Sequence, residues 1–253
     1  MNTQFLEKLR RKELLIGTIV TLASTEVVEI YCTAGFDWLF IDLEHSALNM
    51  REAQLLMQAA TGSAACFIRI PANDETWIKK ALDIGADGII IPQVQTGEEV
   101  RQAVQASKYP PQGTRSVGLA RAQGYGAKFQ EYVSTANTET AVIIQIEHIA
   151  AVNTVEDILA VTGVDGLFIG PYDLAASMGK MGRPDDPEVT AAMARVAKSA
   201  RQAEMPLGIF GATPGSVAPY IMQGYTLIAV GIDTQLLGQT AQNIVSEVSA
   251  QRI

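Results

Sequence analysis

The chain has 253 residues, of which 48% are hydrophobic and 18% charged, and its formal net charge is −8 at pH 7. This composition supports a large buried core, and it fits one large α/β barrel or two ordinary domains. No linker favours two domains. The negative charge argues against a nucleic-acid partner, because binding to a phosphate backbone requires a basic patch.

The two cysteines, Cys32 and Cys66, lie far apart in the sequence and do not form a CxxC pair. They therefore indicate neither a disulfide framework nor a thiolate zinc site. The first residues are polar, and nowhere do about 18 uncharged apolar residues follow one another. We expect no membrane association and a cytoplasmic protein.

The first elements along the chain form a strand followed by a helix. After a polar helix at residues 3–12, the β-branched run at 16–22 predicts a strand. Ser24 is the expected N-cap of a helix at 25–34, and Gly35 is its expected end.

The same unit then recurs along the chain. Further strands are predicted at residues 38–45, 65–71, 87–93, 141–147, 166–170, 206–210 and 227–232. Further helices are predicted at residues 50–61, 74–85, 97–109, 128–137, 150–161, 213–224 and 235–250, with one more ending near 202. Residues 171–187 are predicted as a loop. The irregular segment 110–126 is long for a connection, which makes it a candidate functional loop.

Eight strand–helix units predict an α/β fold, a single (β/α)8 TIM barrel that takes up residues 1–253. The alternative is an open doubly wound sheet. Such a sheet normally has a glycine-rich phosphate turn after its first strand, and this chain has TLAST there. The barrel is therefore favoured.

Active sites of such barrels lie at the C-terminal ends of the strands, where this chain concentrates polar residues. These residues are Asp42, Glu44, His45, Arg69, Gln93, Gln145, Glu147, Asp173 and Asp233. Glu147 and Asp173 follow successive strands about 4.8 Å apart, so together they could hold one hard divalent cation. Each alone could instead cap a helix or join an ion pair.

Strand alternation assigns directions to some of these side chains. Gln145 and Glu147 share the inward face, and His148 takes the other. Arg69 inside an apolar strand needs an anionic partner. His45 fits either proton transfer or simple packing, and the pattern around Asp83 indicates a helix-end residue.

Other chemistries are weakened by what the sequence lacks. An imine-forming aldolase needs a desolvated lysine, but the eight lysines all fall in predicted helices or loops.

Two carboxylates and an arginine around magnesium or manganese would suit a 2-oxoacid, whose enolate oxygen the metal and Arg69 would stabilise.

Several motifs occur in a characteristic order: FDWLFIDLEHS, FIRIP, KYPPQGTRSVG, QIE, GVDGLFIGPYDLAASMG and VGIDTQLL. Over nearly the whole chain they resemble the HpcH/HpaI aldolase/citrate lyase family, specifically its class II pyruvate-dependent aldolases acting on hydroxyoxoheptanedioate or 2-dehydro-3-deoxyglucarate. The resemblance implies reversible cleavage of a 4-hydroxy-2-oxoacid to pyruvate and an aldehyde through a metal-bound pyruvate enolate. The implied cofactor is a divalent ion, Mg, Mn or Co.

The resemblance also implies roles for individual residues. Glu147 and Asp173 match the metal ligands, and Arg69 matches the arginine that polarises the keto group. His45 and Asp83 match a proton-transfer pair, which replaces the helix-end interpretation of Asp83. The implied substrate contacts are Arg69, Gln145, Gly170, Pro171, Tyr172 and Asp173, with Asp42 and Glu44 as candidate supporting residues.

The resemblance further implies a homo-oligomer, commonly a hexamer arranged as a trimer of dimers, with the final helix exchanged between subunits. It also implies that a loop of a neighbouring subunit completes the pocket, and Arg115 and Arg121 in segment 110–126 are candidates for contacts with the aldehyde or with a distal carboxylate. Tyr172 and Leu43 stand where family members with dicarboxylate substrates tend to have smaller residues, so the aldehyde stays open. The alternatives are an acyl-CoA-type carbon–carbon lyase and a non-catalytic 2-oxoacid-binding barrel.

Overall fold

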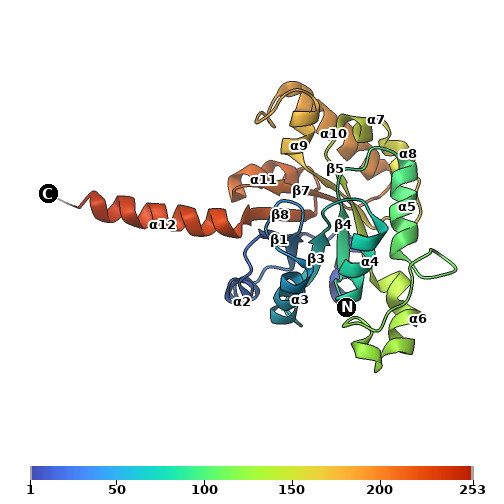
Figure 1. Cartoon of the computed structure of the whole chain (residues 1–253). Helices are drawn as coiled ribbons and strands as arrows, with labels where there is room; N and C mark the ends of the chain where they lie inside the picture. Colours follow the sequence, from blue (N-terminus) through green and yellow to red (C-terminus); the bar gives the residue numbers. More distant parts are fainter. Residues whose placement is uncertain (1, 252–253) are drawn as a thin grey trace.

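A computed structural model, which describes residues 2–251, contains a closed barrel of eight parallel strands in sequence order (Figure 1). The strands are β1 (Leu15–Val20), β2 (Trp38–Asp42), β3 (Ala65–Arg69), β4 (Gly88–Ile91), β5 (Ala141–Ile146), β6 (Gly166–Ile169), β7 (Leu207–Gly211) and β8 (Leu227–Ile232). Pairing of β1 with β8 closes the barrel, with Leu15 opposite Leu227. The predicted (β/α)8 fold is confirmed.

Helices surround the barrel in the order expected from the sequence. They are α1 (Thr3–Arg10), α2 (Thr25–Ala34), α3 (Met50–Ala59), α4 (Glu75–Asp83), α5 (Gly97–Ser107), α6 (Phe129–Glu139), α7 (Ile149–Asn153), α8 (Val155–Leu159), α9 (Pro171–Ser177), α10 (Pro187–Gln202), α11 (Pro214–Met222) and α12 (Asp233–Ser249), with a 3-10 turn at Gly124–Gly126. At α2 the predicted ends are confirmed: the Ser24 side chain accepts the Val27 N–H, and Gly35 follows with φ 91°.

Two predictions about helices were wrong. The single helix expected at 150–161 is divided into α7 and α8 at Thr154. The loop expected at 171–187 begins with α9, whose first residue is Pro171. Proline is favoured at this first position because its missing N–H would have no partner inside the helix.

Alternation along the strands divides the core into two layers. Outward side chains, such as Ile144 and Ile146, pack under the helices. Inward side chains fill the barrel, and Phe5 and Leu9 of α1 join them in that inner cluster. The inner cluster ends in an aromatic floor, where the rings of Phe40 and Phe168 lie 5.6 Å apart. A pocket lies above this floor.

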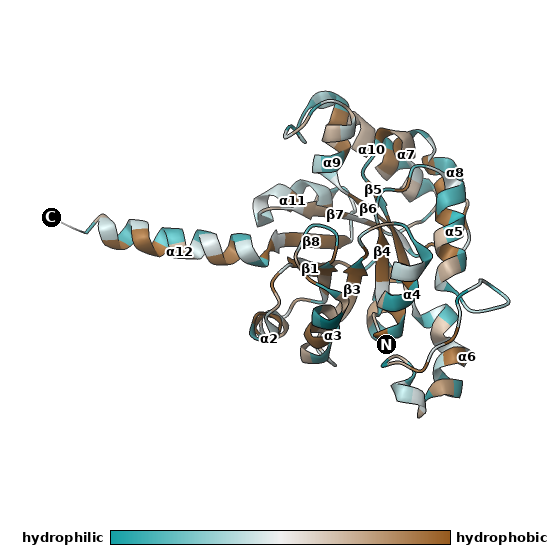
Figure 2. Cartoon of the chain, in the orientation of Figure 1, coloured by the Kyte–Doolittle hydropathy of each residue, from teal (hydrophilic) through white to brown (hydrophobic). Residues whose placement is uncertain are grey.

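The last helix, α12, extends away from the barrel (Figure 1). Its apolar side chains Leu237, Ile244, Val245 and Val248 are each more than half exposed. In Figure 2 hydrophobic patches alternate with polar ones along its length. Across residues 2–251, no helix has both the length and the apolar character that a membrane span requires.

Candidate active site

Arg69 and Asp42 form the central ion pair of the pocket. The residues are opposite each other on β3 and β2. Arg69 Nε donates to Asp42 Oδ1 at 2.9 Å, and Nη2 donates to Asp42 Oδ2 at 2.6 Å. The guanidinium lies over the ring of Phe40, with Cζ 5.1 Å from its centroid. The expected anionic partner of Arg69 is therefore present, and this bidentate geometry fixes the arginine's orientation.

Electrostatics within this pair favour the charged forms. Burial raises the pKa of Asp42, but the hydrogen bonds and charge of Arg69, with the N–H groups of His45 and Glu44, outweigh burial and bring the pKa below its usual value. Arg69 Nη1 forms no hydrogen bond within residues 2–251, which leaves this corner of the guanidinium for a ligand.

Glu44 and His45 follow β2 and continue the polar rim. Glu44 Oε2 lies 3.3 Å from Arg69 Nε and 3.7 Å from His45 Nε2. Burial raises the pKa of Glu44 despite the nearby charge of Arg69. The His45 side chain is 59% exposed and lines the pocket, so it can exchange protons with both ligand and solvent.

Glu147 lies just beyond β5, where two donors orient its carboxylate. The backbone N–H of Gln93 donates to Oε1 at 2.6 Å, and the side-chain amide of Gln145 donates to Oε2. Burial, with the negative charges of Glu44 and Asp173, raises the pKa of Glu147 to about 7. Gly170 makes room for this group, because a Cβ there would lie 3.2 Å from Glu147 Oε2.

Asp173, in the first turn of α9, lines two hollows at once. One, of about 480 Å³, also contains Arg69 and Gln145. The other, of about 350 Å³, also contains Glu147 and Glu44. The structure thus brings Glu147 and Asp173 to one rim. Among residues 2–251, no set of three or more His, Cys, Asp or Glu side chains is arranged to hold a metal ion.

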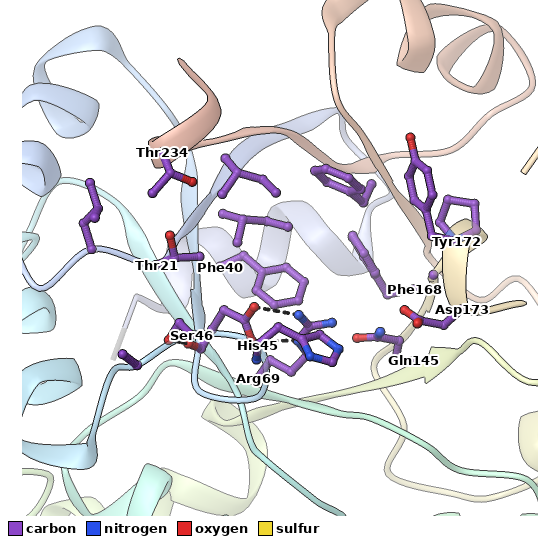
Figure 3. Close-up of a pocket in the computed structure, with 18 residues that line it drawn as sticks. Thr21, Phe40, His45, Ser46, Arg69, Gln145, Phe168, Tyr172, Asp173 and Thr234 are labelled. Carbon is purple, nitrogen blue, oxygen red and sulfur yellow. Dashed lines mark hydrogen bonds and ion pairs between the residues drawn. The ribbon is translucent and has the colours of Figure 1, made fainter. Parts of the chain in front are cut away.

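Figure 3 shows the larger hollow, hereafter the pocket; in this view Arg69 and His45 lie between Ser46 and Gln145. In this view Tyr172 and Asp173 lie on one side, and Thr21 and Thr234 on the other. Gly170, Pro171 and Asp42 also line the pocket. Strand alternation correctly predicted that Gln145 points inward.

His148 and Asp233 have structural partners. The ring of His148 accepts the Ala150 N–H at 3.1 Å and caps α7, and it lines the smaller hollow beside Glu147. Asp233 Oδ2 accepts the N–H groups of Thr21 and Leu22 at 2.6 and 2.7 Å. These hydrogen bonds join the residue after β8 to the segment after β1.

Asp83 is not brought to His45 within one chain. It is the last residue of α4, which leads to the start of β4 and so to the end of the barrel opposite the pocket. Its Oδ1 accepts from Arg115 Nη2 at 2.8 Å. A pairing of His45 with Asp83 would need Asp83 of a second copy, and it stays a prediction.

The two arginines of segment 110–126 are also occupied away from the pocket. Arg115 is fully buried, with Cζ 4.5 Å from the ring centroid of Tyr109. Arg121 donates to the Ile84 carbonyl and to the Thr61 hydroxyl. Within one chain, the expected aldehyde contact by Arg115 or Arg121 is therefore not formed.

Sequence reasoning missed the apolar wall of the pocket. This wall includes Ile19, Leu22, Phe168, Phe210 and Ile232. The strand alternation used for Gln145 could have identified Phe168, which is opposite Gln145 on β6. Leu22 carries no such signal, because it follows the end of β1.

The family model for HpcH/HpaI aldolase/citrate lyase matches residues 16–240. The chain belongs to this family. It is 40% identical over 245 residues to a 4-hydroxy-2-oxo-heptane-1,7-dioate aldolase of Klebsiella pneumoniae, covering 96% of this chain and 92% of that one. It is 38% identical over 239 residues to a 2-dehydro-3,6-dideoxy-6-sulfogluconate aldolase of Pseudomonas putida, covering 93% of each.

A solved HpcH/HpaI aldolase/citrate lyase family protein from Burkholderia cenocepacia superposes with a TM-score of 0.94 at 35% identity. The alignment covers 98% of this chain and 100% of that one. This member of the HpcH/HpaI family is accordingly an aldolase, a carbon–carbon lyase.

Proposed function

We propose that this HpcH/HpaI member is a class II aldolase that reversibly cleaves a 4-hydroxy-2-oxoacid to pyruvate and an aldehyde, with Mg, Mn or Co as cofactor. The observation that carries the proposal is the placement of Arg69, Glu147 and Asp173 at one rim of the barrel. The differing substrate names of the relatives support the reaction type and leave the aldehyde open.

The residues at this rim fit a divalent cation. The neighbouring carboxylates of Glu44 and Asp173 both raise the pKa of the buried Glu147, and a cation would relieve this crowding. Among residues 2–251, Gln145 Oε1 is buried without a hydrogen-bond partner, and Glu44 Oε2 makes no hydrogen bond beside its ion-pair contacts with Arg69 and His45. Glu147 and Asp173 would hold the ion, and their oxygens are the ligands that Mg²⁺ and Mn²⁺ prefer. When bound, the cation would act as a Lewis acid toward the substrate oxygens.

The chain's own residues bind and orient the oxoacid. Arg69 Nη1 would donate to the 2-keto oxygen and stabilise negative charge there. The backbone N–H groups of Tyr172 and Asp173, in the uncapped first turn of α9, would hold the carboxylate, and Gln145 would contact the same end. Asp42 keeps Arg69 in place.

Cleavage would then break the C3–C4 bond. The 4-hydroxyl loses its proton and becomes the aldehyde oxygen, while the bond's electron pair forms the enolate of pyruvate. A proton added to C3 gives pyruvate, so no oxidant or reductant is needed. His45, exposed at the pocket, is the candidate for moving these protons. Asp83 would assist only from a neighbouring subunit.

The test uses proton exchange at pyruvate. With added Mg²⁺ or Mn²⁺ in D2O, we expect the methyl protons of pyruvate to exchange for deuterium in NMR spectra, and EDTA to stop the exchange. An acyl-CoA-type lyase would instead require the thioester. A non-catalytic barrel would bind pyruvate without exchange. Exchange that survives thorough metal removal would refute the class II mechanism.

We also propose that the molecule is a homo-oligomer, a hexamer built as a trimer of dimers, in which α12 packs on another copy. Support comes from the exposed apolar side chains of α12, which extends away from its own barrel. A second copy of this chain would bury them. The cytoplasmic location expected from the sequence stays a prediction.

A further inference from the structure

Gln93 lies two residues beyond β4 and contacts carboxylates on both sides of that strand. Its backbone N–H donates to Glu147 Oε1, beyond the end of β5, at 2.6 Å. Its side-chain amide donates to Glu44 Oε1, beyond the end of β2, at 2.7 Å. Because β3 lies between β2 and β4 in the barrel, this second hydrogen bond joins strands that are not neighbours. One residue therefore connects the two sides of the rim.

The Glu44 carboxylate lies between two groups that act on the oxoacid in the proposed reaction. Its Oε2 is 3.3 Å from Arg69 Nε and 3.7 Å from His45 Nε2. A carboxylate at these distances attracts the guanidinium and, once it has accepted a proton, the imidazole. The position of Glu44 therefore limits where Arg69 and His45 can lie relative to each other.

One hydrogen bond fixes the direction of this carboxylate. Within residues 2–251, the Gln93 amide makes the only hydrogen bond to the side-chain oxygens of Glu44. The backbone N–H of Glu44 donates to Asp42 Oδ1, which holds the chain but leaves the side-chain torsions free. The Glu44 side chain is 5% exposed, so little of it remains for a second copy to contact. The Gln93 amide therefore determines where Oε2 points.

We propose that Gln93 is a positioning residue for the aldolase reaction, whose side-chain amide acts through Glu44 to keep His45 and Arg69 in their working arrangement. Gln93 itself lines the smaller hollow, outside the pocket. Its backbone supports the proposal: φ is 60°, a conformation that is uncommon for residues other than glycine and that clusters at functional sites. The inference rests on the proposed function and adds a residue that acts without touching the substrate.

The test removes the Gln93 amide but keeps the length of the side chain. Gln93→Met retains the backbone N–H and the positive φ and loses the donor to Glu44. We expect the rate constant for Mg²⁺-dependent exchange of the methyl protons of pyruvate in D2O to fall about tenfold, with KM for pyruvate changed by about twofold or less. The matched control is Gln102→Met on α5, which loses a similar hydrogen bond, 3.2 Å, to Glu98 and should exchange like the wild type.

A double-mutant cycle shows whether Gln93 acts through Glu44. Glu44→Gln keeps the shape of that side chain but removes its charge toward His45 and Arg69. In this background Gln93→Met has little left to disturb, so we expect it to lower the exchange rate by about twofold or less. A residue with an independent structural role would instead cause the same loss in both backgrounds.

A second readout requires neither metal nor turnover. The chain has two histidines, so the His45→Asn variant assigns the imidazole C–H signals in NMR spectra of the metal-free protein. Gln93→Met and Glu44→Gln should both shift the His45 signals, because each changes the carboxylate next to the ring. Gln102→Met should leave these signals where they are.

The outcomes separate the two proposals. A wild-type enzyme that exchanges pyruvate protons, with a Gln93→Met variant that keeps the rate or changes only KM, would overturn this inference and leave the aldolase function intact. Equal losses in the two backgrounds, or unchanged His45 signals in Gln93→Met, would overturn the route through Glu44. Absence of metal-dependent exchange in the wild type would refute the proposed function, and this inference with it.

Discussion

The backbone N–H of Gln93, beyond the end of β4, donates a hydrogen bond to Glu147 Oε1 at 2.6 Å. Gln93 makes this contact from a left-handed conformation, with φ 60°, and its side-chain amide donates to Glu44 Oε1 at 2.7 Å. One strained residue thus orients two of the carboxylates at the rim. Strain of this kind persists where surrounding contacts impose it.

Replacing Gln93 separates strain from side-chain contact. Gln93→Gly and Gln93→Ala both keep the N–H and both lose the bond to Glu44. Glycine adopts positive φ without the Cβ penalty, so we expect Gln93→Gly to be more stable than Gln93→Ala by about 1 kcal/mol. Urea unfolding followed by circular dichroism measures the difference. An alanine variant as stable as the glycine variant would show that the strain is absent.

Glu147→Gln should abolish the response to metal. The amide keeps the shape of the side chain but lacks the charge that would hold a divalent cation. We expect pyruvate proton exchange to fall by about 100-fold or more, and Mn²⁺ to lose its effect on Tm. The exposed Glu131→Gln on α6 is the matched control and should behave like the wild type. Full exchange in Glu147→Gln would exclude Glu147 as a required ligand.

Gly170→Ala should disturb the carboxylate without disturbing the fold. Its Cβ would lie 3.1 Å from Glu147 Cβ and 3.2 Å from Gln145 Nε2, so these side chains would have to move. We expect kcat/KM to fall about tenfold, because small displacements of groups that act on the substrate lower the reaction rate strongly. In the control, Gly215→Ala, the nearest atom is 3.9 Å away, and activity should be retained. Equal activities in both variants would contradict the crowding argument.

The Asp42–Arg69 pair predicts a specific acid dependence of stability. Because Arg69 lowers the pKa of Asp42 in the folded state, folding favours the ionised carboxylate. This stabilisation is present above the usual pKa of 3.8 and is lost as the pH falls through the lower folded-state value. Asp42→Asn should lower the free energy of unfolding by about 3 kcal/mol at pH 7. Urea unfolding should give the same difference in the free energy of unfolding between wild type and variant at pH 5, and a smaller difference near pH 3. A difference that stays constant with pH would contradict this dependence on the Asp42 pKa.

The apolar side chains of α12 predict how assembly can be disrupted. Val248→Glu places a charge among the exposed residues Ile244 and Val245, which we expect a second copy to cover. Size-exclusion chromatography with light scattering should show smaller species for this variant. Gln242→Glu, which replaces a polar residue of the same helix, is the control. An unchanged mass for Val248→Glu would place the subunit contact elsewhere.

Repeated local patterns made the barrel and its inner surface predictable. Strand alternation needs only neighbouring residues, so it correctly placed Gln145 inside the barrel. Helix α9 was not predicted, because it is only 7 residues long and begins at a proline, a residue that is also common in loops. The same residue is typical of a helix start, and the preceding Gly170 has no side chain to mark the cap.

Contacts between distant segments were not predictable in the same way. Nothing in the local pattern around Asp83 shows that Arg115 donates a hydrogen bond to it at the end of the barrel opposite the pocket. Asp233 resembled a pocket residue because it follows a strand, but its oxygens are bound to the segment after β1. In both cases the partner is far away in sequence and comes near only through closure of the barrel.

The position of Asp233 has a consequence for the whole molecule. This residue directly follows the last strand, begins α12 and accepts hydrogen bonds from Thr21 and Leu22, which line the pocket. Thr234, the next residue of α12, lines the same pocket. The exposed helix α12 and the pocket wall at Thr234 are therefore consecutive in the chain. A tilt of the helix would therefore move Thr234 and, through the Asp233 carboxylate, the segment at Thr21 and Leu22.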